Sequence, residues 1–266
     1  MKDYSPIKRW YSRLDVKYEM LKFTYNRETA LLIPSFLQDK QIDVGVRTLR
    51  THNTNHLDYV IKNKLMFEEE KRFNFYYSIA KYKNGIPYGV DREDWKKNHH
   101  KEMIGYDFFV DIDAGTHEDI DFALESAELL KKLYDKFSVP YDIRYSGKGF
   151  HFIIPHNKID YNIFEPYTEG NIYENFRVMA KRLQKLISEQ IDAKIYDSRR
   201  ICKIPYSLAI YEDDYFMCCP LQDLQGFNHN NYKVQNVSKL VLRNRGIFMQ
   251  NPDGNTQQLF KHLRGD

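Results

Sequence analysis

Two aspartates stand at the end of a strand-like apolar run, "YDFFVDIDAG", residues 106–115. Because side chains alternate between the two faces of a strand, Asp111 and Asp113 are expected to share one face. Like charges side by side repel each other, and a divalent cation between them relieves the repulsion. The pair therefore indicates a metal site. The alternative is that both residues only end the strand and cap the next element, since "DAGTHED" is rich in turn residues.

A glycine-rich turn comes next in "RYSGKGFHF", residues 144–152. Two glycines flanking a lysine let the backbone curl so that its N–H groups point at an anion, while Ser146, Lys148 and His151 can add side-chain donors. The spacing does not fit the Walker A loop GxxxxGK[ST]. The segment is consistent with a phosphate-binding turn. An ordinary hairpin turn, with a half-buried histidine after it, is the alternative.

A third polar segment is "IDAKIYDSRRICKIPYSL", residues 191–208. It brings two further acids, Asp192 and Asp197, and a series of basic residues that includes Arg200 and Lys203. Taken alone, such a segment is typical of an ion-paired surface loop. The order of the three segments along the chain is more informative than any one of them.

The three segments together resemble the motifs of the archaeo-eukaryotic primase superfamily. The family's first motif, two acids one residue apart after an apolar strand, resembles "VDID" in this chain. Its second motif, a Ser-Gly turn ending in histidine, resembles "SGKGFH". The family's third motif, an acid followed eleven residues later by a basic residue and then by Pro-aromatic-Ser, resembles "DAKIYDSRRICKIPYSL". The resemblance covers residues 104–210, the core motifs.

The resemblance implies a role for each matching residue. Asp192 matches the third motif better than Asp197, because of its distance to Lys203, and the choice between the two acids stays open. The implied metal-binding and catalytic carboxylates are Asp111, Asp113 and Asp192, and the implied nucleotide-binding residues are Ser146, Gly147, Lys148, His151, Arg200 and Lys203. The implied cofactor is a pair of Mg²⁺ or Mn²⁺ ions.

The activity implied is that of a DNA primase or primase-polymerase. Such an enzyme is a template-directed nucleotidyltransferase that synthesises or extends primers from NTPs or dNTPs. The implied partner is a single-stranded DNA template. Two alternatives stay open: a member that works with a helicase or a large subunit, and a short stand-alone primase-polymerase of the plasmid, viral, repair or CRISPR-linked kind. The family's replicative small subunits carry a cysteine-rich zinc-binding stem. Cys202, Cys218 and Cys219 lack the paired spacing of such a site, so we expect no structural zinc and reduced thiols.

The elements expected around these motifs indicate an α+β fold. A strand to Asp113, a helix from near Thr116, a hairpin of "YDIRYS" and "FHFIIP", a helix over residues 171–190 and a last strand predict an antiparallel or mixed sheet with helices on one face. This is close to a ferredoxin-like or RRM-like half. The apolar positions expected to be buried in the two helices include Ile120, Ala123, Leu124, Ala127, Leu130, Tyr134, Phe137, Ile172, Phe176, Met179, Leu183, Leu186 and Ile187.

The rest of the chain gives weaker signals. Upstream, "ETALLIPSF" predicts a strand, "THNTNHLDYVIKNKLMFEEEKR" a helix, and the charged "VDREDWKKNHHKE" an exposed loop. Nothing marks a domain boundary in the 266 residues, so a single catalytic domain over residues 1–266, with possible subdomains, is the prediction. The N-terminal segment is charged, which argues against a secretory leader. No apolar run approaches the length of about 20 residues that a membrane-spanning helix needs, so we expect a cytoplasmic protein.

The amino-acid composition does not decide whether the protein binds nucleic acid. The net charge of +3 neither demands nor excludes nucleic acid. Aromatic residues lie among lysines and arginines in "KRFNFYYSIAKYKNG", which suits stacking on bases, although a basic surface over an aromatic core gives the same pattern.

Three other functions use parts of the same pattern. A non-catalytic nucleic-acid-binding module on a similar sheet would place aromatic residues on its central strands, whereas this face offers Asp111, Asp113, Arg144 and His151. A metal-dependent phosphodiesterase or nuclease also uses clustered carboxylates, and pyrophosphate release separates it from a polymerase. For a scaffold protein, an Asp113→Ala change would leave every activity unchanged.

Overall fold

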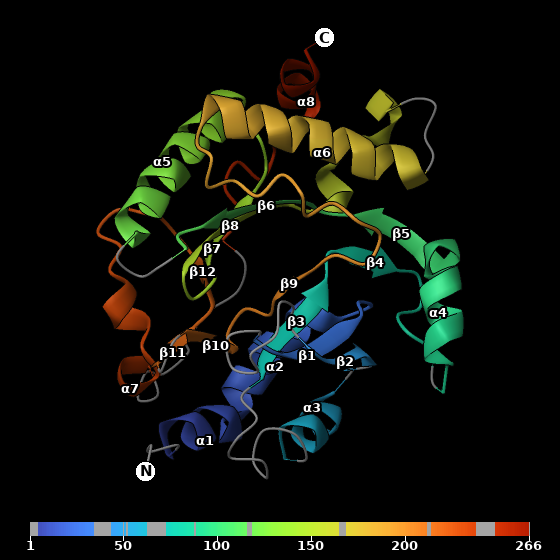
Figure 1. Cartoon of the computed structure of the whole chain (residues 1–266), viewed down its shortest axis with the longest axis vertical. Coiled ribbons are helices and arrows are strands. Elements are labelled where there is room, and N and C mark those ends of the chain that lie inside the picture. The colour runs from blue at the N-terminus through green and yellow to red at the C-terminus, as the bar shows by residue number, and fades with distance from the viewer. Residues whose placement is uncertain are drawn as a thin grey trace. The chain divides into compact units, whose positions relative to one another are not determined.

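The chain forms two compact units in the computed structural model (Figure 1). The structure describes residues 5–34, 44–49, 51, 53–62, 73–87, 89–115, 119–164, 169–211, 214–237 and 248–265. The first unit comprises Met1–Ile104, Ile201–Cys219 and Asn228–Gly246, and the second Gly105–Arg200, Pro220–Phe227 and Ile247–Asp266. The predicted α+β class with antiparallel sheets is confirmed. The single domain over residues 1–266 stays a prediction.

The first unit is built on a four-stranded sheet in the order β2-β1-β3-β9. Its strands are β1 (Thr29–Ile33), β2 (Val44–Leu49), β3 (Asn74–Ser78) and β9 (Ile201–Lys203), and neighbours run antiparallel. Its helices are α1 (Ser5–Ser12), α2 (Leu14–Thr24), α3 (Thr54–Val60) and the short α7 (Val234–Val237). A hairpin of β10 (Leu208–Tyr211) and β11 (Asp214–Met217) completes the unit.

The aromatic residues of "KRFNFYYSIAKYKNG" serve the core of this unit. Phe75 and Tyr77 on β3, and Tyr82 further along, are almost fully buried. Over these positions the structure therefore supports an aromatic core rather than a surface for base stacking. The thiols of Cys202, Cys218 and Cys219 are buried as well. Burial raises the pKa of Cys218 to about 11, which makes its thiolate scarce at neutral pH.

The segment expected as an exposed loop, residues 90–102, is helical instead. It forms α4 (Arg92–Asn98) and a 3-10 turn, His99–Glu102, which leads into β5 (Met103–Tyr106), the partner of β4 (Ala80–Tyr82). The Asp91 side chain caps α4 by accepting from the backbone N–H groups of residues 93 and 94. Trp95 is buried with its ring 4.9 Å from that of Tyr82. A good cap and one inward aromatic residue outweigh the charged composition.

The second unit carries the three motifs on a four-stranded sheet in the order β12-β7-β8-β6. Its strands are β6 (Phe108–Asp113), β7 (Asp142–Tyr145), β8 (Gly149–Ile154) and β12 (Cys219–Leu221), with β6 and β7 both antiparallel to β8. The helices α5 (Ile120–Lys136), α6 (Glu169–Leu186) and α8 (Gln257–Arg264) cover one face of the sheet (Figure 1). The Phe108 ring lies 4.9 Å from Phe176 of α6 and 5.4 Å from Phe260 of α8.

The order of strand, helix, hairpin, helix and strand agrees with the prediction, but the last strand, β9, lies in the sheet of the first unit, and before it the chain forms only a single bridge to β6. Ile191 pairs with Ile112 at the edge of β6, and the Asp192 N–H donates to the carbonyl of Asp111 over 3.0 Å. Asp192 Oδ1 then accepts from the N–H of Lys194, which turns the chain and ends the pairing. The chain goes on to β9, in the sheet of the first unit.

The helix boundaries also differ from the prediction in places. The helix expected from near Thr116 begins at Ile120, and Thr116 lies outside the described residues. Leu124 and Phe137 are half-buried rather than buried, whereas most of the other apolar positions of α5 and α6 are buried as expected. Leu186, the last residue of α6, is 47% exposed, and Ile187 just beyond it is half-buried. In the described part of the chain, no helix is both long and apolar enough to span a membrane.

Candidate active site

Asp111 and Asp113 lie on one face of β6, as the alternation of the strand requires. The buried Ile112 between them points the other way, toward the side of the sheet that α5, α6 and α8 cover. The two carboxylate side chains are 23% and 42% exposed. The acid pair is therefore accessible on the face away from the helices.

Two basic side chains of the second motif, Lys148 of the turn and His151 of β8, lie against this acid pair. Lys148 Nζ is 2.8 Å from Asp113 Oδ2, and His151 Nε2 is 3.5 Å from Asp111 Oδ1. His151 stands directly opposite Asp111 in the β6/β8 register. The first and second motifs, which lie far apart in the sequence, thus form one polar cluster.

The two glycines of the turn are required for different reasons. Gly147 has φ 104°, a conformation that side chains disfavour, and its carbonyl accepts from the Tyr145 hydroxyl over 2.5 Å. At Gly149 the limit is space, because an added Cβ would lie 2.1 Å from the Ile112 carbonyl oxygen. The Ser146 N–H donates to the Gly149 carbonyl over 2.9 Å, and Ser146 itself is buried. The turn is pressed closely against the strand that carries the acids.

Asp192 joins this cluster through its backbone, and Asp197 does not. The hydrogen bond from the Asp192 N–H to the Asp111 carbonyl fixes Asp192 beside the acid pair. Asp197 instead organises its own loop, since its carbonyl accepts from the Tyr106 hydroxyl over 2.7 Å and its Oδ1 from the Arg199 N–H over 2.8 Å. The arrangement favours Asp192 as the third carboxylate, and its role stays a prediction.

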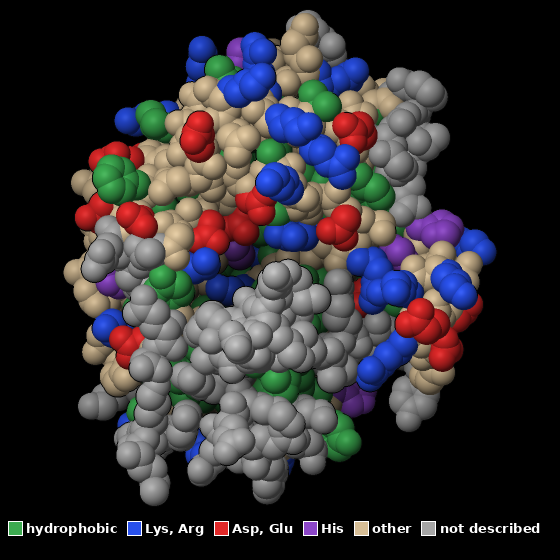
Figure 2. Space-filling view, viewed as in Figure 1, with side chains coloured by type: hydrophobic (Ala, Val, Ile, Leu, Met, Phe, Trp, Pro, Cys, Tyr) green, Lys and Arg blue, Asp and Glu red, His purple; other side chains and the backbone are tan. Residues whose placement is uncertain are grey.

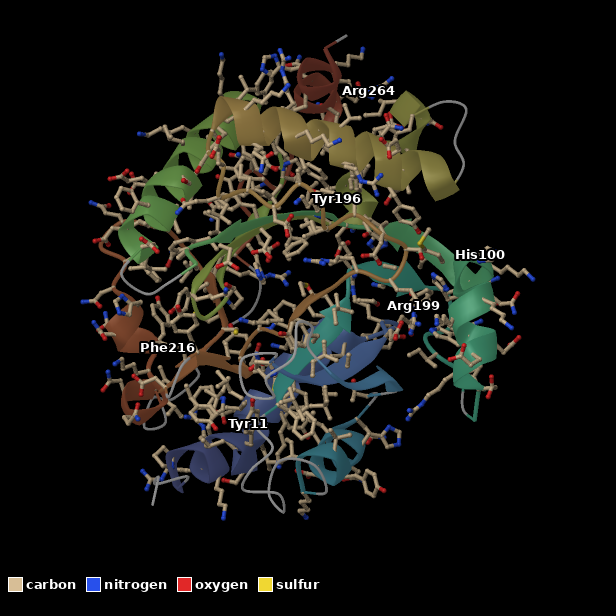
Figure 3. All side chains as sticks on the ribbon, viewed as in Figure 1. Tyr11, His100, Tyr196, Arg199, Phe216 and Arg264 are labelled. Atoms are coloured by element: carbon tan, nitrogen blue, oxygen red, sulfur yellow. The ribbon has the colours of Figure 1, made fainter. Side chains whose placement is uncertain are left out.

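Tyr196 holds the third segment against the sheet (Figure 3). Its hydroxyl donates to the carbonyl of Phe109 over 2.7 Å, and its ring stacks on Phe108 with centroids 6.0 Å apart. Burial raises the pKa of Tyr196 well above its ordinary value, and the carboxylates of Asp192 and Asp111 add to this shift. The tyrosine therefore stays a neutral hydrogen-bond donor that anchors the loop.

The two basic residues of the third motif fall in different units. Arg200 closes the loop, with its N–H donating to the Asp197 carbonyl over 3.2 Å, and its charge counteracts the rise that burial causes in the pKa of Tyr106. Lys203 lies on β9, where it pairs with Tyr76 in the sheet of the first unit. The expectation that both face the triphosphate of a nucleotide stays a prediction.

The donor chemistry of the cluster suits a hard divalent cation. Asp111, Asp113 and Asp192 offer carboxylate oxygens, which Mg²⁺ and Mn²⁺ prefer. In the described ranges, however, no three His, Cys, Asp or Glu side chains are arranged as a ready-made metal group. The ammonium group of Lys148 and the imidazole of His151 lie close to the acids instead.

The buried partner of Arg144 was not anticipated from the sequence. Asp142 and Arg144, 1% and 4% exposed, form an ion pair on β7 with Nε 2.5 Å from Oδ2. Burial raises the pKa of Asp142, while the Arg144 guanidinium opposes this rise. The same alternation that groups Asp111 with Asp113 places Asp142 and Arg144 on one strand face, so the spacing in "DIRYS" was the available signal.

Basic side chains also gather on the helical side of this unit. Figure 2 shows Lys and Arg side chains over α6, and Lys181, Arg182 and Lys185 of that helix are exposed. This surface lies on the other side of the sheet from Asp111 and Asp113. The positive charge of the unit is therefore not confined to the acid cluster.

Comparison with known proteins identifies the fold but no family. No protein-family model matches the sequence, and no curated protein matches it either. Among solved structures, the chain is similar to the polymerase domain of Mycobacterium tuberculosis Ligase D in complex with DNA, with a TM-score of 0.50 and 11% sequence identity. The match covers 97% of this chain and 91% of that one. At this identity the likeness shows a shared fold alone.

Proposed function

We propose that the protein is a template-directed nucleotidyltransferase, a primase-polymerase of the archaeo-eukaryotic primase type that makes or extends primers from NTPs or dNTPs. The observation that carries the proposal is the cluster in which Asp111 and Asp113 share a strand face with Lys148 and His151 against them. A fold shared with a polymerase domain that was solved with DNA supports a nucleic-acid template.

Asp111, Asp113 and Asp192 are the residues that would hold Mg²⁺ or Mn²⁺. Two such ions stabilise the attacking and the leaving oxygen of an in-line displacement at phosphorus. In the proposed reaction, a 3′-hydroxyl attacks the α-phosphate of the incoming nucleotide, the new phosphodiester bond forms, and pyrophosphate leaves. No covalent intermediate on the protein is needed.

Lys148 and His151 would bind the triphosphate. Lys148 extends from the glycine turn and His151 from β8, so an anion held by both lies beside the acid pair. Lysine is a compact point charge on a flexible stem, which lets it exchange Asp113 for a phosphate oxygen. Fixed positive charge at this place orients the nucleotide and stabilises the charge that develops on pyrophosphate.

The test is incorporation of labelled nucleotides on a single-stranded template, with and without a primer, in Mg²⁺ and in Mn²⁺. We expect products whose sequence is complementary to the template, with one pyrophosphate released for each nucleotide added. The Asp111→Asn/Asp113→Asn double variant should make none. Degradation of the template without pyrophosphate release would indicate a nuclease. Template binding without incorporation by the wild type would leave a nucleic-acid-binding module.

A further inference from the structure

Three polar side chains form a row across the sheet of the second unit. In the register of β7, β8 and β6, Arg144 stands opposite His151, and His151 stands opposite Asp111. Side chains directly opposite each other on antiparallel strands have Cβ atoms about 5 Å apart. His151 is therefore bracketed by a cation on one side and a carboxylate on the other.

The guanidinium of Arg144, the cation in this row, is held by an ion pair with Asp142. Arg144 Nε donates to Asp142 Oδ2 over 2.5 Å, two residues earlier on the same face of β7, and both side chains are buried. A buried ion pair costs much of its own attraction in desolvation and is weak evidence of a role in stability. Asp142 Oδ1 also has no hydrogen-bond partner within the described residues. Because the Asp142–Arg144 pair lies next to His151 in the sheet, a more specific role for the pair is to act on His151.

The imidazole of His151 has neighbours on several sides. Its ring meets the Phe109 ring edge to face, with centroids 4.8 Å apart at 85°, and its Nε2 points toward Asp111. Arg144 stands opposite His151 in the β7/β8 register, so the Cβ atoms of the two residues are about 5 Å apart. Replacing Arg144 would therefore change the side chain that neighbours His151 across the sheet.

We propose that Arg144, held by Asp142, is a positioning residue that fixes the orientation of His151 on the nucleotide face. For the role of His151 in binding a nucleoside triphosphate, the inference rests on the proposed function. Arg144 suits this task because its guanidinium is planar and stays charged at all physiological pH values. The pair acts through His151 and not by touching the substrate.

A double-mutant cycle tests this directly. The dissociation constant of a nucleoside triphosphate with Mn²⁺ is measured for the wild type, Arg144→Met, His151→Ala and the double variant. Loss of a residue that orients a ligand-binding group costs about 10-fold or more in affinity. We expect each single variant to bind about 10-fold more weakly, and the double variant no more weakly than His151→Ala. If the two single-variant losses of affinity multiply in the double variant, the inference is overturned.

A second readout does not depend on nucleotide binding. The ring signals of ¹⁵N-labelled histidine, with His151 assigned from the His151→Ala spectrum, should move in Arg144→Met. Lys17→Met is the matched control, because it breaks the largely buried Lys17–Asp58 ion pair of the first unit, and it should leave the His151 signals in place. If Arg144→Met does not fold, Asp142→Asn, which keeps the arginine but weakens its anchor, should move the same signals.

The two readouts also separate the inference from the proposed function. Unchanged His151 signals in both Arg144→Met and Asp142→Asn would refute the positioning role, whatever the wild type binds. A wild type that binds no triphosphate in Mg²⁺ or Mn²⁺ would refute the proposed function. The histidine spectra would still decide whether Arg144 orients His151.

Discussion

Asp111 and His151 lie directly opposite each other on β6 and β8, with Nε2 of the histidine 3.5 Å from Oδ1 of the aspartate. This pairing brings the acid motif and the glycine-turn motif onto adjacent strands. Because the β6/β8 register is fixed by buried side chains on the other face, both motifs are placed by the packing of the sheet rather than by loops. Substitutions at the acids, the turn and the covering helix probe separate parts of this arrangement.

The choice of the third carboxylate can be tested with two matched variants. Asp192→Asn removes a charge next to the acid pair and should reduce metal-dependent nucleotide incorporation by about 100-fold or more, in the range seen when a group that stabilises a transition state is lost. Asp197→Asn keeps an oxygen that can accept from the Arg199 N–H and should retain most of the activity. Equal losses in the two variants, or the reverse order, would argue against Asp192.

Lys148 is predicted to matter for substrate and little for stability. Its ion pair with Asp113 is partly exposed, and such pairs contribute less than about 1 kcal/mol. Lys148→Gln should therefore leave the melting temperature nearly unchanged while raising the KM for the nucleotide about 10-fold, the effect of losing one hydrogen bond to a charged group. Lys132→Gln, at an exposed position on α5, is the control and should change neither quantity. A large loss of stability in Lys148→Gln would contradict this assignment.

The close approach of the turn to β6 predicts a stability difference between two glycines. Gly149→Ala would place a Cβ 2.1 Å from the Ile112 carbonyl oxygen, so the strands must separate, at a cost of about 1–3 kcal/mol. At Gly226, which has φ +68°, an added Cβ would meet nothing within 4 Å. Gly226→Ala should therefore cost about 1 kcal/mol, from backbone strain alone. Denaturant melts of the two variants compare these costs, and a smaller loss in Gly149→Ala would be inconsistent with the packing of the turn.

The lowered pKa of Asp135, on α5, predicts that the stability of the fold depends on pH. Burial alone would raise the pKa of this carboxyl, but hydrogen bonds from Lys131, Tyr141 and Asn251 lower it below its ordinary value. A carboxyl whose pKa is lower in the folded state stabilises the fold above the unfolded pKa, near pH 4, and this contribution is lost as the pH falls through the folded pKa. Asp135→Asn should lower the melting temperature at pH 7, and the gap to the wild type should close as the pH falls through the lowered pKa of the folded state. A gap that widens in acid would contradict the sign of the shift.

Much of the second unit could be predicted because its signals are local. Alternation in "VDID" places Asp111 and Asp113 on one face, and the glycines of "SGKG" mark the hairpin that brings His151 opposite Asp111. These features depend on the two-residue period of a strand and on turn chemistry, both of which a sequence displays.

The features that could not be predicted depend on contacts between distant residues. The backbone hydrogen bond from Asp192 to Asp111 joins residues 81 positions apart, and nothing in the loop sequence indicates it. The charged segment that holds α4 was misread because the Asp91 cap and one buried residue, Trp95, outweigh its charged composition. Periodicity has little to measure in so short a helix.

The proposed metal site on β6 can be tested by Mn²⁺ binding, measured by electron paramagnetic resonance in the presence of a non-hydrolysable nucleoside triphosphate. The wild type should bind Mn²⁺, and the Asp111→Asn/Asp113→Asn variant, with an unchanged melting profile as its control, should lose this binding. Mn²⁺ bound equally well by a folded variant would contradict the proposal, because the carboxylates of β6 would then not be the metal site.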